Sequence, residues 1–517
     1  MSQKNARAKR SIKNAVVSTA YYLINLLLGF FSRKIFFNHL GSEVLGLGTT
    51  ARDLIGFLQI SELGIGAAVA FLLYKPLFED DREKIKEIVT VQGWLYQRIA
   101  IFIISAACVL MCFFPSIFAK SDLPLGYAYI VFIALLIGVM MSYFFNFRLI
   151  VLTARQQQYK IVRVFQSAEI VKILLQIFTV STFKNPFFWW IGLELATRLV
   201  STLLMDRLIK KEYPWLKLDM KKGKEYLARN KVIIKKTKQV FFHRLAGAAL
   251  LNSSSPILYA FTSLTTVAFY GNYQIIISKL SRLIGNLFNS TAAGVGDLVA
   301  EGNKRSIMRV FWELYDSRFV IAAIIIICSY QLTDPFISSW LSPDYLLGKR
   351  FLLLYLILQG IMMTRETVDS FINAHGMFQD IWAPMVEATL NIGLSILFGS
   401  WWGLEGIILG VITSLVIIIE IWKPIFLFKV GFKESVLPYF IKLAGRLVMV
   451  MVIAFVVTKV SPLLPMASEA YGSFLKWTIY AIEVTLLTSA ILIPSFLAFS
   501  EGLRNFFRRM TSIIFNK

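Results

Sequence analysis

The chain has 517 residues, of which 57% are hydrophobic and 14% aromatic, whereas only 16% are charged, and its mean hydropathy is +0.65. Soluble domains carry about 25% charged residues and lack repeated apolar runs of about 20 residues. The composition therefore excludes a soluble enzyme, a secreted disulfide scaffold and a disordered chain.

The formal net charge of +23 raises the question of nucleic-acid binding, because a basic surface is the footprint of phosphate recognition. The three cysteines lie inside apolar segments without a CxxC pair, and the three histidines are scattered along the chain. This pattern predicts no disulfide framework, no bound metal and no cofactor.

Apolar segments long enough to cross about 30 Å of hydrocarbon recur along the whole chain. The first, Ala15 to Phe31, follows a basic N-terminus and exceeds the h-region of a signal peptide, so it is predicted to be an uncleaved span. Fourteen spans are predicted, and the chain is therefore expected to be an all-α polytopic membrane protein. They cover residues 12–38, 43–74, 87–115, 124–153, 160–183, 187–209, 238–262, 266–299, 308–332, 350–374, 381–398, 405–428, 438–460 and 475–499.

A polar connection with twelve Lys or Arg between Asp206 and Lys238 divides the spans into six and eight. We interpret it as a linker that lies on the inner membrane surface. The predicted organisation is two six-helix lobes followed by two extra C-terminal helices. Its parts are an N-lobe at 1–209, a basic cytoplasmic linker at 210–237, a C-lobe at 238–428, and the two extra helices with a basic cytoplasmic tail at 429–517.

The orientation follows from the distribution of Lys and Arg, which accumulate in cytoplasmic loops. The connections on the side of the N-terminus carry 35 of these residues, and the opposite connections carry 8. Both termini are therefore predicted to be cytoplasmic. The basic excess is explained by topology and by attraction to anionic headgroups, so no nucleic-acid partner is expected.

The second span matches the eighth without a gap at an offset of 230 residues, with five identities in 26 positions between Leu45–Ala70 and Ile275–Ala300. An even number of helices in each half gives a parallel repeat, the plan of transporters that rock around a site between two bundles. The same register aligns two polar stripes on single helix faces, which predicts a shared central cavity. The stripes are Thr49, Arg52, Gly56 and Gln59 in the second span, and Lys279, Arg282, Asn286 and Asn289 in the eighth.

Basic residues near the ends of the spans are counted with the connections, and eleven are assigned to the span interiors, where a charge requires a partner, a wet cavity or a route to the interface. They are Arg52, Arg98, Arg148, Lys172, Arg198, Arg244, Lys279, Arg282, Arg318, Arg365 and Arg446. Three of them have an acid three or four positions away, which predicts ion pairs within one helix. These predicted pairs are Glu169 with Lys172, Glu194 with Arg198, and Arg365 with Asp369.

Other cations in the spans have no acid on their own helix face. Lys279 and Arg282 share a face, which predicts either an anionic ligand or a partner from another helix, and the same holds for Arg52. Arg98, Arg148 and Arg244 also lack such an acid. Arg148 and Arg244 lie near the inner end of their spans, so reaching the headgroups is the alternative for these two.

The segment GSEVLGLGTTARDLIGFLQISELGIGAAVAFLLYK, Gly41 to Lys75, together with the basic N-terminus, the two six-helix halves and the two extra helices, resembles polysaccharide-export flippases of the Wzx type. These belong to the multidrug/oligosaccharidyl-lipid/polysaccharide exporter superfamily, which also contains lipid II flippases. The resemblance implies a multi-pass protein of the bacterial cytoplasmic membrane that is not an enzyme. It implies a cavity lined by helices one, two, seven and eight, which carry Arg52, Arg244, Lys279 and Arg282.

The resemblance further implies a polyprenyl-diphosphate-linked glycan as cargo, flipped by alternating access for surface polysaccharide assembly. It implies membrane lipids, a polysaccharide polymerase and glycosyltransferases as partners. Asp53, Glu62 and Glu420 are candidates for coupling an ion, and a buried ion pair is the favoured interpretation of each. The alternative functions are a lipid II flippase, a cation-coupled multidrug antiporter of the same fold, and a membrane glycosyltransferase.

Overall fold

The computed structural model describes residues 3–515 except 63, 156, 290, 378 and 381. Within the helices, the side chains of 3–13, 15, 60–61, 67, 235–236, 238–240, 242–246, 248–251, 282–294, 510 and 512–515 lie outside the description.

The described residues form helices and contain no strand, which confirms the predicted all-α polytopic membrane fold. Among the described residues, each of the fourteen predicted spans is mostly helical. Within the described part of the chain, nine helices are long and apolar enough to cross a membrane. Helix α1 (Gln3–Leu58) carries the first predicted span and the first part of the second, and it is broken at Gly41. Helix α15 (Trp382–Leu415) carries the eleventh span and the first part of the twelfth, and it is broken at Trp402 and Gly403.

Glycine is required at the first of these breaks. Gly41 has a φ of 80°, a conformation that side chains with a Cβ rarely adopt. The break therefore lies in the short interval between the first two predicted spans.

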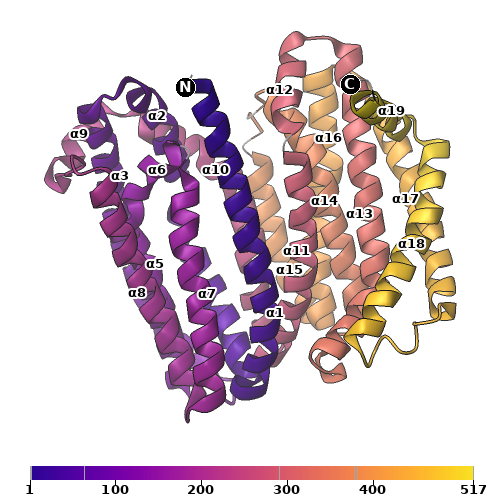
Figure 1. Ribbon diagram of the computed structural model, residues 1–517, viewed down its shortest axis with the longest axis horizontal. Helices are drawn as coiled ribbons and strands as arrows, with labels where there is room; N and C mark the ends of the chain where they lie inside the picture. Colours follow the sequence, from indigo (N-terminus) through magenta and orange to yellow (C-terminus); the bar gives the residue numbers. More distant parts are fainter. Residues whose placement is uncertain are drawn as a thin grey trace. The chain divides into compact units, whose positions relative to one another are not determined.

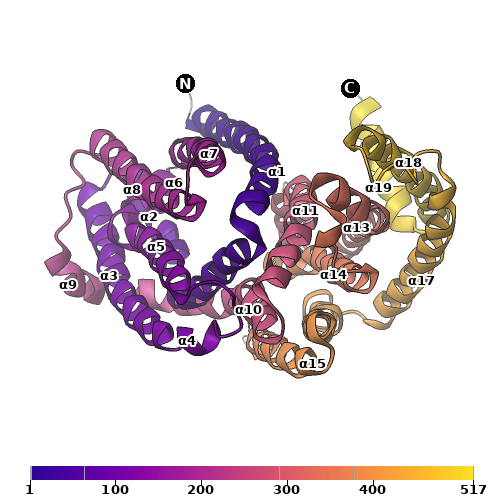
Figure 2. The same cartoon turned by 90° about the horizontal axis from the view of Figure 1, so that it is seen from below.

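The chain forms two compact units, Met1–Ala268 and Phe269–Lys517. The remaining elements of unit 1 are η1 (Gln59–Glu62), α2 (Ile65–Glu79), α3 (Arg82–Cys112), α4 (Phe114–Ile117), α5 (Leu125–Phe144), η2 (Asn146–Leu149), α6 (Ile150–Ala154), α7 (Gln158–Thr182), α8 (Pro186–Glu212), η3 (Met220–Lys222), α9 (Gly223–Arg229) and α10 (Val232–Phe261). In unit 1, α1 packs on α7 and α10, and α7 packs on α8, so that α1, α7 and α8 lie side by side (Figure 2).

The division between the units falls after α10, which packs closely against α1 and α2. The predicted lobes at 1–209 and 238–428 stay a prediction. A Cβ added at Gly46 would lie 1.9 Å from the carbonyl oxygen of Leu264, and one at Gly56 would lie 2.2 Å from Oδ1 of Asn252. The contact at Gly46 is with backbone, so only glycine permits the second half of α1 to approach Leu264 this closely.

The basic connection predicted as a linker is folded rather than extended. It contains η3 and α9, and α9 packs on α3. Gly223 lies against the side chain of Trp94, and Arg229 pairs with Glu87 at 3.4 Å. The connection is therefore attached to unit 1.

The elements of unit 2 follow Phe269, which lies within α11 (Leu264–Asn289). They are α12 (Thr291–Glu301), α13 (Lys304–Trp340), η4 (Pro343–Tyr345), α14 (Lys349–Ala374), α15, η5 (Val416–Trp422), α16 (Lys423–Phe426), η6 (Leu427–Phe432), α17 (Leu437–Val460), η7 (Ser461–Leu463), α18 (Phe474–Phe499) and α19 (Glu501–Phe515). Helix α13 is central, because it contacts α14, α18 and α19 (Figure 1). Its core includes the mutually packed rings of Phe311, Tyr315, Phe428 and Tyr439.

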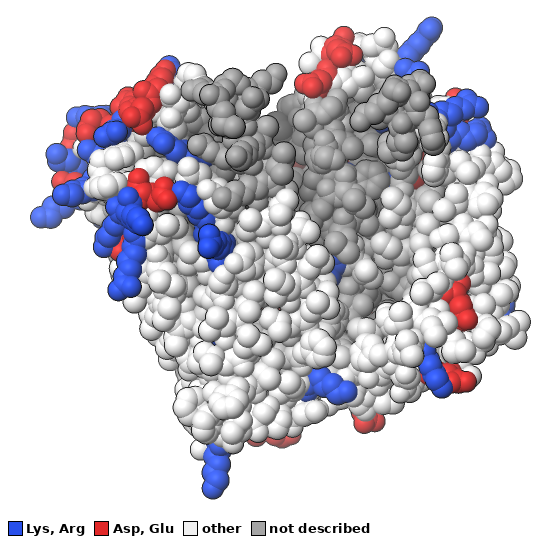
Figure 3. All heavy atoms as spheres, in the orientation of Figure 1, with Lys and Arg blue, Asp and Glu red and all other residues white. Residues whose placement is uncertain are grey.

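Large apolar side chains are exposed along the outer helices. Met451 and Phe455 of α17 and Leu475 of α18 are each more than 60% exposed. On the visible face of each unit, Lys, Arg, Asp and Glu side chains gather mainly at the helix ends, and the band between is mostly uncharged (Figure 3). This pattern is that of a surface solvated by acyl chains.

Candidate functional site

Arg52 lies on the second half of α1 and is exposed. No described residue forms a hydrogen bond or an ion pair with it. Its charge acts on Glu194 of α8, on the neighbouring Asp53 and on Arg33 of the first half of α1, so its guanidinium lies on the side of these polar groups. A guanidinium that has no hydrogen-bond acceptor among the described residues is suited to contact an anion.

Arg33 is a second cation at this place. It lies near the end of the predicted span at 12–38 and was counted with the outer connection, so it is not among the predicted site residues. Its Nη2 donates to the carbonyl oxygen of Ala268 at 2.9 Å, and its guanidinium lies 5.0 Å from the ring centroid of Phe37. Arg33 and Arg52 are brought together because the chain reverses at Gly41. A signal was available, since the apolar run continues beyond Arg33 to Phe37.

A buried ion network lies beside this cationic pair. Lys172 of α7 binds Glu169 at 2.6 Å and Glu194 of α8 at 2.7 Å, and Arg198 binds Glu194 at 3.4 Å. The predicted pairs within α7 and within α8 are confirmed. The contact between Lys172 and Glu194 was not predicted, and it joins the two helices into one network that fixes the charge facing Arg52.

The first half of α1 also presents hydrogen-bonding groups to α7. The amide of Asn25 donates to Gln166 at 2.7 Å, and the hydroxyls of Tyr21 and Ser167 lie 2.6 Å apart. Such groups are satisfied against a neighbouring helix and not against lipid. Helices α1, α7 and α8 thus share a polar interior in unit 1.

Gln59 and Glu62, from the predicted stripe and the predicted coupling acids, lie in η1. Tyr96 donates to Oε1 of Glu62 at 2.5 Å, and Tyr143 donates to Oε2 at 2.7 Å. Gln59 is also close to the Tyr143 hydroxyl. The carboxylate therefore attaches η1 to α3 and α5.

The other predicted residues of unit 1 lie at several places. Asp53 is half-buried beside Ser255 of α10. Arg98 is exposed and stacks on Trp94, with its guanidinium 5.1 Å from the ring centroid. Arg148 forms an ion pair with Asp206 of α8, which also binds Lys210 at 2.6 Å. The side chain of Arg244 lies outside the described residues.

In unit 2, Lys279 is half-buried on α11 and takes part in an interaction. The side chains of Arg282, Asn286 and Asn289 lie outside the described residues. A binding role for these four residues stays a prediction.

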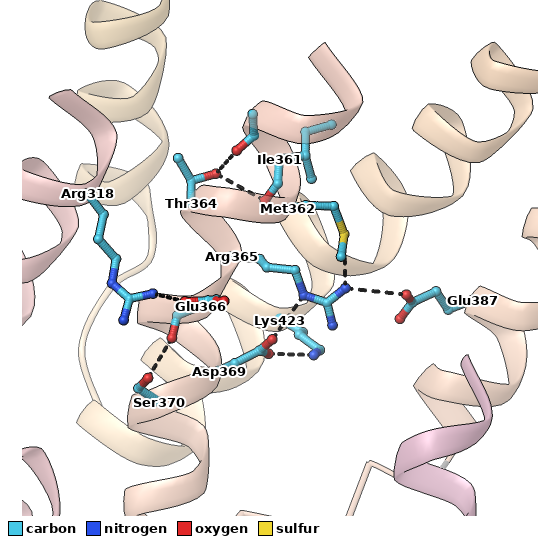
Figure 4. Close-up of polar contacts among 11 residues, drawn as sticks. Arg318, Ile361, Met362, Thr364, Arg365, Glu366, Asp369, Ser370, Glu387 and Lys423 are labelled. Atoms are coloured by element: carbon cyan, nitrogen blue, oxygen red, sulfur yellow. Dashed lines mark hydrogen bonds and ion pairs between the residues drawn. The ribbon is translucent and has the colours of Figure 1, made fainter. Parts of the chain in front are cut away.

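The described part of unit 2 contains a charged cluster that the sequence analysis found only in part (Figure 4). The predicted pair on α14 is confirmed, with Nε of Arg365 3.0 Å from Asp369. Lys423 of α16 binds the same carboxylate at 2.5 Å, and Arg365 lies 3.8 Å from Glu387 of α15. The cluster therefore connects three elements.

A second pair lies next to it on the other side of α14. Arg318 of α13 donates to Glu366 at 2.5 Å (Figure 4). Glu420, a predicted coupling acid, is half-buried in η5 beside Thr364 and Arg365. Glu420 thus lies at the edge of this cluster. Oε1 of Glu387 has no hydrogen-bond donor among the described residues, and its neighbour there is Nη1 of Arg365 at 3.8 Å. An ion-coupling role for Glu420 stays a prediction.

No metal centre is evident in the part of the chain that the structure describes, since no three His, Cys, Asp or Glu side chains converge on one point there.

Comparison with protein-family models finds no match, and comparison with curated proteins finds none either. Solved structures do match. One is described as the lipid II flippase MurJ in an inward closed conformation; it is 15% identical, the match covers 93% of this chain and 99% of that chain, and the TM-score is 0.63.

Two transporters of the MOP superfamily match as well. A multidrug resistance MATE family transporter in an inward-facing conformation is 13% identical, with a TM-score of 0.57, over 80% of this chain and 97% of that chain. A transporter from Pyrococcus furiosus, described as having a binding pocket of reverse polarity, is 13% identical, with a TM-score of 0.53, over 83% and 97%. The chain therefore has the fold of MOP-superfamily transporters.

Proposed function

We propose that this protein is a flippase that moves a polyprenyl-diphosphate-linked oligosaccharide from the inner to the outer leaflet of a bacterial cytoplasmic membrane. The observation that supports this most directly is Arg52, which is exposed and has no hydrogen bond or ion pair among the described residues, beside Arg33 on a polar face of α1, α7 and α8. A diphosphate head requires cationic groups and a polar surface while its lipid tail stays in the bilayer.

The proposed mechanism is alternating access, with unit 1 and unit 2 as the moving bodies. Arg52 contacts the diphosphate as cargo enters from the inner leaflet, and the predicted cations of α10 and α11 contribute from the second repeat. An inside-negative potential favours outward movement of an anion by about 2.3 kcal/mol per charge per 100 mV. Surface polysaccharide assembly, with its polymerase and glycosyltransferases, is the proposed context.

Replacement of Arg52 tests this function. In a host strain that lacks its own copy, Arg52→Ala is expected to lower surface polysaccharide by roughly 10- to 100-fold, because a hydrogen bond to a charged group contributes about 1.5–3 kcal/mol. Arg52→Lys should retain part of the activity, since lysine keeps the positive charge but lacks the paired N–H donors of a planar guanidinium.

Arg163→Ala is the matched control, because Arg163 is an exposed arginine of α7 without a described partner. All variants are compared at equal amounts in the membrane. Full export by Arg52→Ala would exclude Arg52 from the mechanism.

The structural similarity to MurJ favours lipid II as a second candidate cargo. Lipid II and the proposed oligosaccharide cargo are both carried on a polyprenyl diphosphate. Expression in a strain depleted of its lipid II flippase and in a strain depleted of its polysaccharide flippase separates the two cargoes. We expect rescue in the second strain; rescue of growth in the first alone would assign lipid II.

A multidrug antiporter of this fold is disfavoured by the positive charge at the α1 face. Such an antiporter carries cations, which Arg33 and Arg52 would repel.

A further inference from the structure

Unit 2 contains a cavity of about 1130 Å³ that the proposed function does not use. It lies between the first turns of α13, the η6 segment, the first half of α17 and the junction of α18 with α19. This is the upper end of unit 2 in Figure 1, which the charge distribution predicts to be cytoplasmic.

The cavity has an excess of positive charge. Its lining includes six basic side chains and three acidic ones. Of the acids, Asp316 is already engaged, because it pairs with Arg446 and accepts a hydrogen bond from Ser500 at 2.5 Å. Glu434 and Glu501 are exposed and do not balance the remaining cations. The cations are Lys304, Arg305, Arg309, Lys442, Arg446 and Arg504.

Arg446 is the buried member of this set, with only 8% of its surface exposed. One nitrogen of its guanidinium faces Asp316, whereas Nε and Nη1 have no hydrogen-bond acceptor among the described residues. Its guanidinium lies 5.0 Å from the ring centroid of Trp312. A buried donor without an acceptor is costly, so these two nitrogens are suited to an oxygen ligand that enters the cavity.

Lys442 supports Arg446 from one turn earlier on the same face of α17. Its Nζ lies 4.2 Å from the ring centroid of Trp312. The indole of Trp312 thus positions two cations, the planar guanidinium of Arg446 and the flexible ammonium of Lys442. This combination matches the oxygens of a phosphate group.

The other wall of the cavity is aromatic and apolar. Phe428, Phe432 and Phe496 are buried, and Phe499 is 83% exposed where α18 meets α19. A soluble phosphate compound would gain little from these rings. An amphiphile would place its charged head at Arg446 and its apolar part along them.

We propose that this cavity binds the phosphate headgroup of an anionic phospholipid from the leaflet at this end of unit 2, with Arg446 and Lys442 as its ligands. Basic pockets between membrane helices on the cytoplasmic side are suited to such headgroups. The proposed site is separate from the α1 face and does not depend on the identity of the cargo.

Native mass spectrometry of the purified full chain tests the proposal. The probes are phosphatidylglycerol and phosphatidylcholine, each added in detergent at equal concentration. We expect the wild-type chain to retain phosphatidylglycerol in preference to phosphatidylcholine. Lys442→Gln should reduce that retention by about fivefold, the effect of one basic contact to an anionic lipid. Lys459→Gln, at the other end of α17, is the control and should leave it unchanged.

Arg446→Lys is the second variant, because it keeps the charge beside Asp316 but removes the two open donors. It should lower phosphatidylglycerol retention while Tm stays close to that of the wild type. Equal retention of both lipids, or no effect of either variant, would overturn the proposal. Displacement of the lipid by millimolar inorganic phosphate would also overturn it, since the site would then belong to a soluble anion.

Discussion

Glu62 shows how a single acid can be satisfied within the apolar part of a membrane helix. Its two oxygens accept hydrogen bonds from Tyr96 and Tyr143, whose rings contact each other edge to face with centroids 5.2 Å apart. The carboxylate is therefore solvated by two phenols instead of water.

Removal of one phenol should destabilise unit 1. Tyr143→Phe leaves one oxygen of Glu62 without its donor, and loss of a partner to a buried polar group costs about 1–3 kcal/mol. We expect a lower Tm for the purified protein in detergent. Tyr74→Phe serves as the control, because Tyr74 is 56% exposed. Equal Tm values for the two variants would show that the phenol of Tyr143 does not stabilise the fold.

The charged residues also show which part of the site follows from sequence. Pairs three or four positions apart on one helix were predictable, because helix geometry places such side chains on one face. The partners Glu194 for Lys172, and Lys423 and Glu387 for the α14 pair, were not predictable. These contacts cross between helices, and helix spacing and rotation depend on packing that a local pattern does not encode.

At the scale of the elements, the spans were predictable because the length of an apolar run is a local property. The predicted span at 124–153 is an informative exception. It is mostly apolar, with Asn146 and Arg148 as its strongly polar residues, and the structure divides it into α5, η2 and α6. The division places Phe147 and Arg148 on η2, where Arg148 reaches Asp206 of α8. Tertiary contacts therefore override the continuous pattern.

Close packing of α1 gives a prediction at this scale. Gly46→Ala would place a Cβ 1.9 Å from the carbonyl oxygen of Leu264, which is backbone and cannot rotate away. Overpacking costs about 1–3 kcal/mol, so Tm and the yield of folded protein should fall.

The control for this substitution is Gly192→Ala, because a Cβ at Gly192 meets no atom within 4 Å. Alanine in a helix interior is about 0.5–1 kcal/mol more favourable than glycine, so this variant should be as stable as the wild type or more so. A Gly46→Ala protein with unchanged Tm would contradict the close contact between α1 and the start of α11.

At the scale of the whole molecule, the fold predicts a protein that crosses the membrane many times, and the Lys and Arg distribution predicts which ends are cytoplasmic. Labelling of single cysteines tests that orientation. In a chain with Cys108, Cys112 and Cys328 replaced, Asp122→Cys lies in a predicted outer connection and Lys221→Cys in the basic connection. Both positions are exposed, so reagent access depends on the side of the membrane.

A membrane-impermeant maleimide added to intact cells that lack an outer membrane should label Asp122→Cys and leave Lys221→Cys unlabelled. After detergent permeabilisation, both should react, which controls for accessibility of the thiol. The reverse pattern would invert the orientation. Because an inside-negative potential would then oppose export of an anion, that result would also remove the electrical driving force from the proposed flipping reaction.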